Sequence, residues 1–237
     1  MKKQIGILGG MGPEATSELF SLIIKNTKAQ NDQDHVPVLI VNNPKIPDRS
    51  AYIHGKGPSP VDMLVEGAVK LEKMGADFIL IPCNTAHLFI KQIEKNIHIP
   101  IIDMIKETAL YVLHKYPEIK TYGLLSTSGT YETGIYKNTF ADIDLMIIDP
   151  DIDYQRQNMT AIYGKQGIKA GFKTEPFKIL LQSVENLEKN GVRAIICGCT
   201  EIALVVKQSH IKIPLINPLQ ILAVRSIQLA GYSLSTT

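Results

Sequence analysis

The stretch Gly6-Ile-Leu-Gly-Gly-Met-Gly12 decides the fold, because a related stretch, Gly123-Leu-Leu-Ser-Thr-Ser-Gly129, follows 117 residues later. In each stretch an apolar run ends in a turn of glycine and small residues. Two further pairs recur at a spacing of 116 residues: Leu71-Glu-Lys-Met-Gly75 with Leu187-Glu-Lys-Asn-Gly191, and Cys83 with Cys199. Three anchors at nearly one spacing indicate an internal duplication.

Short apolar runs rich in β-branched residues alternate with longer amphipathic stretches through both halves of the chain. The runs are residues 4–8, 36–41, 78–81, 100–102, 122–125, 145–148, 194–197 and 213–216. This alternation is typical of α/β proteins, in which each strand feeds a crossover helix and the sheet is mostly parallel. Apolar residues recur about every 3.6 positions in residues 61–75, which predicts a helix on a sheet with Gly75 as its C-cap.

We therefore expect two similar α/β lobes with mostly parallel sheets. The lobes would be related by pseudo-two-fold symmetry, with the active site in the cleft between them. Residues 1–103 and 218–237 would form the N-terminal lobe, including a returning C-terminal helix, and residues 104–217 the C-terminal lobe. A length of 237 residues suits one large domain or two small ones.

The composition excludes several classes of protein. Hydrophobic residues make up 45% and charged residues 20% of the chain, which is the balance of a globular protein. A net charge of +2 without a basic block argues against nucleic-acid binding. No apolar run approaches the roughly 20 residues of a membrane span, and the start lacks a signal-peptide pattern, so we expect a cytoplasmic protein without a membrane partner. Three cysteines are too few for a disulfide framework.

Two of these cysteines, Cys83 and Cys199, follow predicted strands. Ligands of open α/β sheets bind outside the carboxyl ends of the strands. If the lobes face each other, the two thiols approach one cleft from opposite sides. One group that removes a proton and an opposed group that returns one invert a carbon centre, so this arrangement predicts racemisation or epimerisation.

The protonation of the two thiols follows from simple electrostatics. A free cysteine has a pKa of about 8.5, and each thiol precedes a helical segment whose dipole is expected to lower that pKa. Two nearby thiolates repel each other, which favours a site with one thiolate and one thiol. Backbone N–H groups at the two helix starts, together with Asn84, Thr85 and Thr200, would stabilise the carbanion. No metal or pyridoxal cofactor is needed.

Five ordered motifs resemble the cofactor-independent aspartate racemases of the aspartate/glutamate racemase superfamily. The motifs are Ile7-Leu-Gly-Gly-Met-Gly-Pro-Glu-Ala-Thr16, Asn42-Asn-Pro-Lys-Ile-Pro-Asp-Arg49, Pro82-Cys-Asn-Thr-Ala-His87, Ile168-Lys-Ala-Gly171 and Gly198-Cys-Thr-Glu201. The resemblance covers nearly the whole chain. It implies a two-lobed enzyme, usually a homodimer, that interconverts L- and D-aspartate with two cysteines and no cofactor.

The resemblance also implies roles for individual residues. Cys83 and Cys199 would be the acid/base pair, and Arg49 and Lys169 would hold the substrate carboxylates. The pocket would be completed by Met11, Gly12, Asn84, Thr85, Thr127 and Thr200. The first turn lacks the Asp-Ser-Gly of dedicated glutamate racemases, so aspartate is the first hypothesis and a glutamate or broad-specificity racemase the second. A two-lobed module that binds an acidic amino acid without turnover is the alternative of another class.

Each of these residues also has a structural interpretation. An isolated cysteine is more often a small core residue, and we assign Cys197 that role because it continues an apolar run. His87 lies four residues after Cys83 and suggests zinc together with Cys197 and Cys199, but no paired Cys-x-x-Cys is present. Hydrogen bonding near a helix start is the favoured interpretation of His87.

The glycine-rich turn and the charged residues have alternatives as well. The turn is not a nucleotide-binding loop, because it matches neither G-x-G-x-x-G nor a Walker sequence, and Pro13 removes a backbone donor. By default Arg49 and Lys169 would be solvated charges, and without the resemblance Lys165 and Lys169 cannot be separated. Glu14 and Glu201 are explained by the helix dipole alone.

Overall fold

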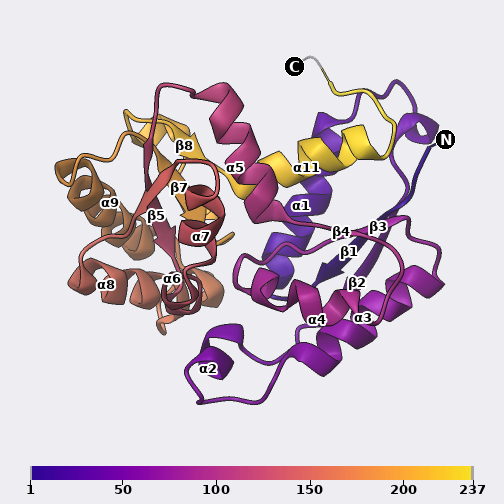
Figure 1. Ribbon diagram of the computed structural model, residues 1–237, viewed down its shortest axis with the longest axis horizontal. Coiled ribbons are helices and arrows are strands. Elements are labelled where there is room, and N and C mark those ends of the chain that lie inside the picture. The colour runs from indigo at the N-terminus through magenta and orange to yellow at the C-terminus, as the bar shows by residue number, and fades with distance from the viewer. Residues whose placement is uncertain (1, 236–237) are drawn as a thin grey trace. The chain divides into compact units, whose positions relative to one another are not determined.

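Two four-stranded parallel sheets form the frame of the chain in the computed structural model, which describes residues 2–235 (Figure 1). The first sheet has the order β2-β1-β3-β4 and the second β6-β5-β7-β8. The strands are β1 (Ile5–Gly9), β2 (Val38–Asn42), β3 (Phe78–Leu80), β4 (Ile101–Ile102), β5 (Thr121–Ser126), β6 (Met146–Ile148), β7 (Ile195–Gly198) and β8 (Leu215–Ile216). Every strand pair is parallel. The predicted α/β class is confirmed, and both halves repeat one strand order.

Helices connect these strands. They are α1 (Pro13–Asn26), α2 (Arg49–Ile53), α3 (Val61–Lys73), α4 (Ile90–Glu94), α5 (Met104–Lys115), α6 (Ser128–Thr133), α7 (Ile135–Ala141), α8 (Ile152–Tyr163), α9 (Thr174–Lys189), α10 (Ile202–Val205) and α11 (Pro218–Leu229). Short 3₁₀ helices are η1 (Asp32–Asp34), η2 (Thr85–Phe89), η3 (Ile168–Ala170) and η4 (Gln208–His210).

The chain divides into two compact units, residues 2–107 with 219–235, and residues 108–218. The sequence analysis had placed the lobe boundaries after residues 103 and 217. The first boundary of the structure instead falls inside α5, a continuous helix whose first turn belongs to the first unit. The second boundary lies at the start of α11.

The first sheet is covered on both faces. Ile5 and Ile7 of β1 pack in a cluster with α1 and α11, whereas Leu8 faces a second cluster that contains Leu64 and Leu71 of α3. Successive side chains of a strand point to opposite faces, so a strand covered on both sides must be apolar throughout. This is why β1 reads as an uninterrupted apolar run. Helix α11, drawn in yellow, returns the C-terminal part of the chain to this first unit (Figure 1).

The second sheet is built in the same way. Ile195 and Cys197 of β7 pack in a cluster with α8 and α9. Tyr122 of β5 belongs to a separate aromatic group, with its ring centroid 5.8 Å from that of Phe140. Cys197 is fully buried, and burial raises the pKa of its thiol to about 12. The interpretation of Cys197 as a core residue therefore agrees with the structure.

The predicted helix over residues 61–75 is α3, but its C-cap is not Gly75. The helix ends at Lys73, Met74 occupies the C-cap position, and Gly75 follows it with φ of +94°. A left-handed residue directly after the cap ends many helices, and glycine adopts that conformation without strain. The glycine therefore has the expected role one position further along.

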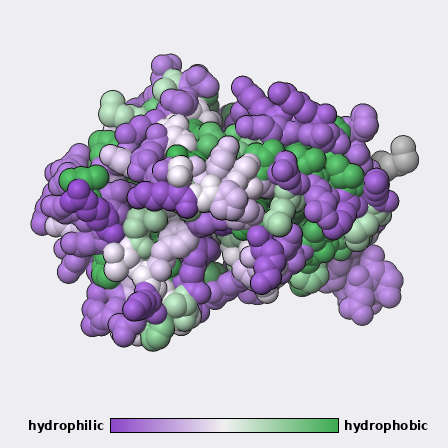
Figure 2. Space-filling model, turned by 90° about the horizontal axis from the view of Figure 1, so that it is seen from below, coloured by the Kyte–Doolittle hydropathy of each residue, from purple (hydrophilic) through white to green (hydrophobic). Residues whose placement is uncertain are grey.

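None of the helices within residues 2–235 is long and apolar enough to span a bilayer. Hydrophilic side chains cover most of the face drawn in Figure 2, with smaller hydrophobic groups between them.

Candidate active site

Three of the segments that leave the carboxyl edge of the first sheet carry predicted site residues. The turn after β1 contains Met11 and Gly12. Its preceding residue, Gly10, has φ of +101°, and a Cβ there would lie 2.3 Å from backbone atoms of Asn43. Only glycine fits this close approach between the two loops. The turn is therefore fixed against the loop that follows β2.

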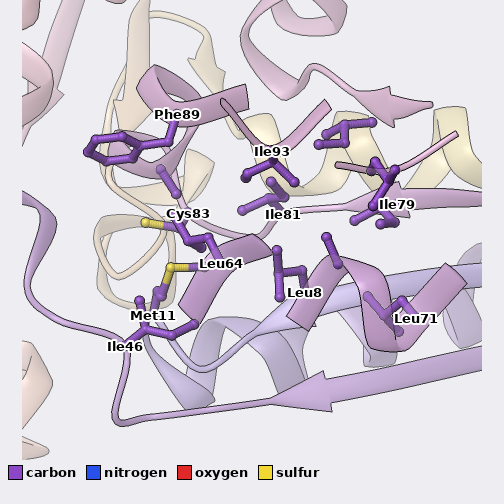
Figure 3. Close-up of a cluster of buried hydrophobic side chains, with 14 of the residues drawn as sticks. Leu8, Met11, Ile46, Leu64, Leu71, Ile79, Ile81, Cys83, Phe89 and Ile93 are labelled. Atoms are coloured by element: carbon purple, nitrogen blue, oxygen red, sulfur yellow. The ribbon is translucent and has the colours of Figure 1, made fainter. Parts of the chain in front are cut away.

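Cys83 lies three residues after β3, in a tight turn closed by its own N–H, which donates to the carbonyl of Ile81 at 2.8 Å. The thiol is free, and the residue is only 6% exposed. It belongs to the cluster that includes Met11 and Leu64 (Figure 3). The structure thus places Met11 and Cys83 together, with the Met11 side chain buried in the core of the first unit.

His87 holds the Cys83 turn in place with both of its ring nitrogens. The backbone N–H of Met104 donates to Nε2 at 3.1 Å, so Nε2 carries no proton. The proton is therefore on Nδ1, which donates to the carbonyl of Cys83 at 2.8 Å. Burial is the main cause that lowers the pKa of His87, although Asp103 and the Cys83 carbonyl oppose it. Neutral His87 links the Cys83 turn to the start of α5, as the hydrogen-bonding interpretation expected.

Arg49 is buried, so its default interpretation as a solvated charge is wrong. Its guanidinium donates to three backbone carbonyls, of Ile46 at 3.3 Å, Pro47 at 2.9 Å and Met11 at 3.2 Å. The preceding residue, Asp48, caps α2 by accepting the N–H of Ala51 at 2.7 Å. A buried cation is thereby held beside the Met11 turn at the carboxyl edge of the first sheet.

Asn84 and Thr85 follow Cys83 directly, and both are buried. Thr85 begins η2. All six predicted residues of the first unit therefore lie in the segments that follow β1, β2 and β3 at one edge of one sheet: Met11, Gly12, Arg49, Cys83, Asn84 and Thr85.

Cys199 follows β7 directly in the second unit and is 6% exposed. Its Sγ donates to Oε2 of Glu201 at 3.0 Å, and the hydroxyl of Thr200 donates to the same oxygen at 3.1 Å. Lys169, from η3, forms a short ion pair with the other oxygen, Oε1. The Lys169 side chain is 24% exposed and that of Glu201 only 5%. The thiol, carboxylate and ammonium form one connected chain.

The pKa values in this chain follow from its geometry. Burial, and then the negative charge of Glu201, raise the pKa of Cys199 well above its ordinary value, against the opposing charge of Lys169. Burial also pushes up the pKa of Glu201, but Lys169 and the bond from Cys199 bring it below its ordinary value. The site therefore holds a Cys199 thiol and a Glu201 carboxylate.

Thr127 lies at the end of β5, the position that corresponds to the first turn of the other unit. It is buried and caps α6, accepting the N–H of Thr130 at 3.3 Å. The four predicted residues of the second unit are Thr127, Lys169, Cys199 and Thr200. Lys169, Cys199 and Thr200 each contact the carboxylate of Glu201. Thr127 follows β5, the strand next to β7.

Three details of the sequence analysis need correction. The helix after Cys199 is α10, which has only four residues, and the pKa of Cys199 is raised and not lowered as the dipole argument predicted. Glu201 is a direct partner of the thiol, so the helix dipole alone does not explain it. Of the two lysines that the residues alone could not distinguish, Lys165 and Lys169, it is Lys169 that forms the ion pair with Glu201. The sequence signal for this contact was the position of Glu201 two residues after Cys199, in the motif Gly198-Cys-Thr-Glu201.

The described residues contain no candidate metal site. Within residues 2–235, no three side chains of histidine, cysteine, aspartate or glutamate gather as metal ligands. Both nitrogens of His87 are occupied by backbone partners.

Comparisons with known proteins identify the family of the chain and its fold. The model of the Asp/Glu/hydantoin racemase family matches residues 8–225. The aspartate racemase of Picrophilus torridus is 33% identical, with a TM-score of 0.84 over 98% of this chain and 96% of that one. The broad-specificity amino-acid racemase RacX of Bacillus subtilis is 29% identical over 90% of this chain and 92% of its own. Glutamate racemase isoform RacE1 of Bacillus anthracis, at 16% identity and a TM-score of 0.66, shares the fold.

The two parallel α/β units have the two-lobed fold of the aspartate and glutamate racemases. The chain belongs to the Asp/Glu/hydantoin racemase family. It is an amino-acid racemase and hence an isomerase.

Proposed function

We propose that the protein interconverts L- and D-aspartate without a cofactor, using Cys83 and Cys199 as its two acid/base groups. The observation that carries this proposal is the matching position of two buried, free thiols after the third strand of each repeated sheet. Similarity to an aspartate racemase over nearly the whole chain supports the choice of substrate. Similarity to RacX supports broad specificity as the second candidate.

In the proposed reaction the thiols serve opposite faces of the substrate α-carbon. One sulfur, as thiolate, takes the α-proton, and the electrons of the C–H bond pass into the adjacent carboxylate to give an enediolate-like carbanion. The opposite thiol then gives its proton to the other face, and the C–H bond forms again with inverted configuration. One proton is removed and one returned, so the balance requires neither a metal nor pyridoxal.

Charged groups at the two edges would hold the substrate. Arg49 offers a guanidinium whose fork suits a carboxylate, and Lys169 offers an ammonium that pairs with the carboxylate of Glu201. Asn84, Thr85, Thr127 and Thr200, with the Met11-Gly12 turn, would complete the pocket. As the resemblance implies, we also propose that the protein acts as a homodimer.

The decisive experiment compares three cysteine variants in heavy water. Cys83→Ala and Cys199→Ala are each expected to lower the rate of inversion of either aspartate enantiomer by at least about 100-fold, because each removes one acid/base group. Cys197→Ala is the matched control, since this third cysteine is buried in β7, and it should invert aspartate at close to the original rate. Optical rotation reports inversion, and NMR reports deuterium at the α-carbon.

Full activity in either Cys83→Ala or Cys199→Ala would reject the paired mechanism. Assays with glutamate and with neutral amino acids separate strict from broad specificity. A carbonyl reagent that captures pyridoxal should leave the rate unchanged.

A further inference from the structure

The hydroxyl group of Thr16, on α1, holds the turn that follows β1. Its oxygen accepts the N–H of Gly10 at 3.0 Å, and its O–H donates to the carbonyl of Gly12 at 3.1 Å. A hydroxyl serves as donor and acceptor at once, so the two bonds form together. Thr16 is only 3% exposed, which shields both bonds from water. The hydroxyl therefore fixes the backbone on either side of Met11.

The same turn carries one of the backbone partners of Arg49. The carbonyl of Met11, between the two residues that Thr16 binds, accepts a hydrogen bond from Nη2 of Arg49 at 3.2 Å. The turn also packs closely against the loop that carries Arg49, since a Cβ at Gly10 would lie 2.3 Å from the backbone of Asn43. A shift of the turn therefore displaces the Met11 carbonyl and, with it, the guanidinium.

The corresponding turn of the second unit is held by a different side chain. At the offset of 117 residues, Gly10 corresponds to Thr127, which caps α6 with its own hydroxyl. Thr16 corresponds to Thr133, whose hydroxyl donates to two carbonyls within α6, at 2.8 Å and 3.2 Å. Gly10 has φ of +101° and no room for a Cβ, so it offers no side chain for this purpose. In the first unit the hydroxyl comes from the following helix instead.

Resting on the proposed function, we infer that Thr16 is a positioning residue for substrate binding. Its hydroxyl holds the Met11 carbonyl, and through it the Arg49 guanidinium, in the orientation that receives a substrate carboxylate. Without the hydroxyl, the buried N–H of Gly10 loses this acceptor and the turn relaxes to find another. Arg49 then keeps its charge but loses the fixed orientation on which two-point binding of a carboxylate depends. Thr16 thus acts through Arg49 and not on the substrate.

The test compares two variants that differ from each other only in the hydroxyl group. Thr16→Ser keeps the hydroxyl, and Thr16→Ala removes it. We expect Thr16→Ala to raise KM for aspartate about tenfold, because it loosens a charge-assisted contact to the substrate carboxylate. Its kcat should stay within about threefold, since a contact of equal strength in the ground state and the transition state affects KM alone. Thr16→Ser should keep both constants within about twofold of the original values.

Thr133→Ala is the matched control, because it removes the corresponding hydroxyl of the second unit, which bonds only within α6 in the contacts described above. It should leave KM and kcat unchanged. Isothermal titration calorimetry gives Kd for aspartate without relying on turnover, and Kd of Thr16→Ala should rise by the same factor as KM. Thermal unfolding checks that each variant is folded.

Equal KM values in Thr16→Ser and Thr16→Ala would overturn the inference, as would a lower kcat with unchanged KM, which a merely structural role predicts. Should Thr16→Ala not fold, Thr16→Val decides, because it lacks the hydroxyl but fills a similar volume. If neither variant folds, the hydroxyl serves folding and the inference fails. If the unsubstituted protein binds aspartate without inverting it, the proposed function fails and the Kd values still decide this inference. If it neither binds nor inverts an acidic amino acid, both fail.

Discussion

His87 illustrates how a single buried residue fixes the turn that carries Cys83. Its Nε2 accepts the N–H of Met104, and its Nδ1–H donates to the carbonyl of Cys83. This pattern requires a neutral ring, because a protonated Nε2 would face a backbone donor. The neutral form is also the one that burial favours, which is why the pKa of His87 is lowered. Protonation of His87 in acid should therefore break its hydrogen bond with the N–H of Met104 and loosen the Cys83 turn.

The corresponding prediction concerns stability at low pH. The pKa of His87 is lower in the folded than in the unfolded protein, so below about pH 6.5 the unfolded chain binds more protons and the free energy of unfolding falls, by up to about 1.4 kcal/mol per pH unit. In His87→Gln this part of the slope should disappear, as measured by urea unfolding between about pH 7 and pH 5. His98→Gln, at a side chain that is 95% exposed, is the control and should keep the slope. Equal slopes in all three proteins would contradict this account.

Glu201 shows what a sequence cannot reveal at the residue scale. Its helix position and its acidity were visible, but its cation, Lys169, lies 32 residues earlier in the chain. From its position in the chain we explained the acidic Glu201 by the helix dipole alone. Its contact with Lys169 is a tertiary one, and no local sequence pattern predicts it. Arg49 is similar, since its carbonyl partner at Met11 is 38 residues away. The positions of Cys83 and Cys199 after a strand could be predicted, because the repeat itself marked them.

At the scale of elements, helix α3 packs against the core cluster of the first unit that contains Cys83. Leu64, on its buried stripe, is fully buried in the same cluster as Met11 and Cys83 (Figure 3). The neighbouring Met63 points away from that cluster and is 37% exposed. The apolar period of residues 61–75 was sufficient to predict this helix and its buried face. The strands were predicted with ends that differ by one or two residues, because hydrogen bonding and not apolarity decides where a strand ends.

The two neighbours on α3 provide a matched test of this packing. Leu64→Ala should lower the free energy of unfolding by about 3 kcal/mol, because it removes buried methyl groups and leaves a cavity. Met63→Ala should cost less than about 1 kcal/mol. Urea unfolding at neutral pH measures both. Similar losses in the two variants would mean that α3 is not packed as described.

For the whole molecule, the duplication explains why one chain offers two thiols in similar settings. Each unit repeats the same strand order, and in each the cysteine follows the third strand in chain order. The units differ in the partners of Arg49 and Lys169: backbone carbonyls hold Arg49 in the first unit, and a carboxylate holds Lys169 in the second. Sequence similarity between the halves indicated the shared fold, and only the structure showed the differing partners.

The duplication is not a simple tandem, because α11 at the end of the chain belongs to the first unit. Leu222 of α11 is fully buried in one cluster with Ile5 and Ile7 of β1. Leu222→Ala should therefore increase hydrogen exchange in β1, because it weakens the packing on that sheet, and leave β5 as protected as before. Leu180→Ala, at a fully buried leucine of the second unit, should have the opposite pattern. Hydrogen-exchange mass spectrometry resolves the two strands. Equal loss of protection in β1 and β5 in both variants would show that the units unfold together and that the C-terminal helix does not belong to one of them alone.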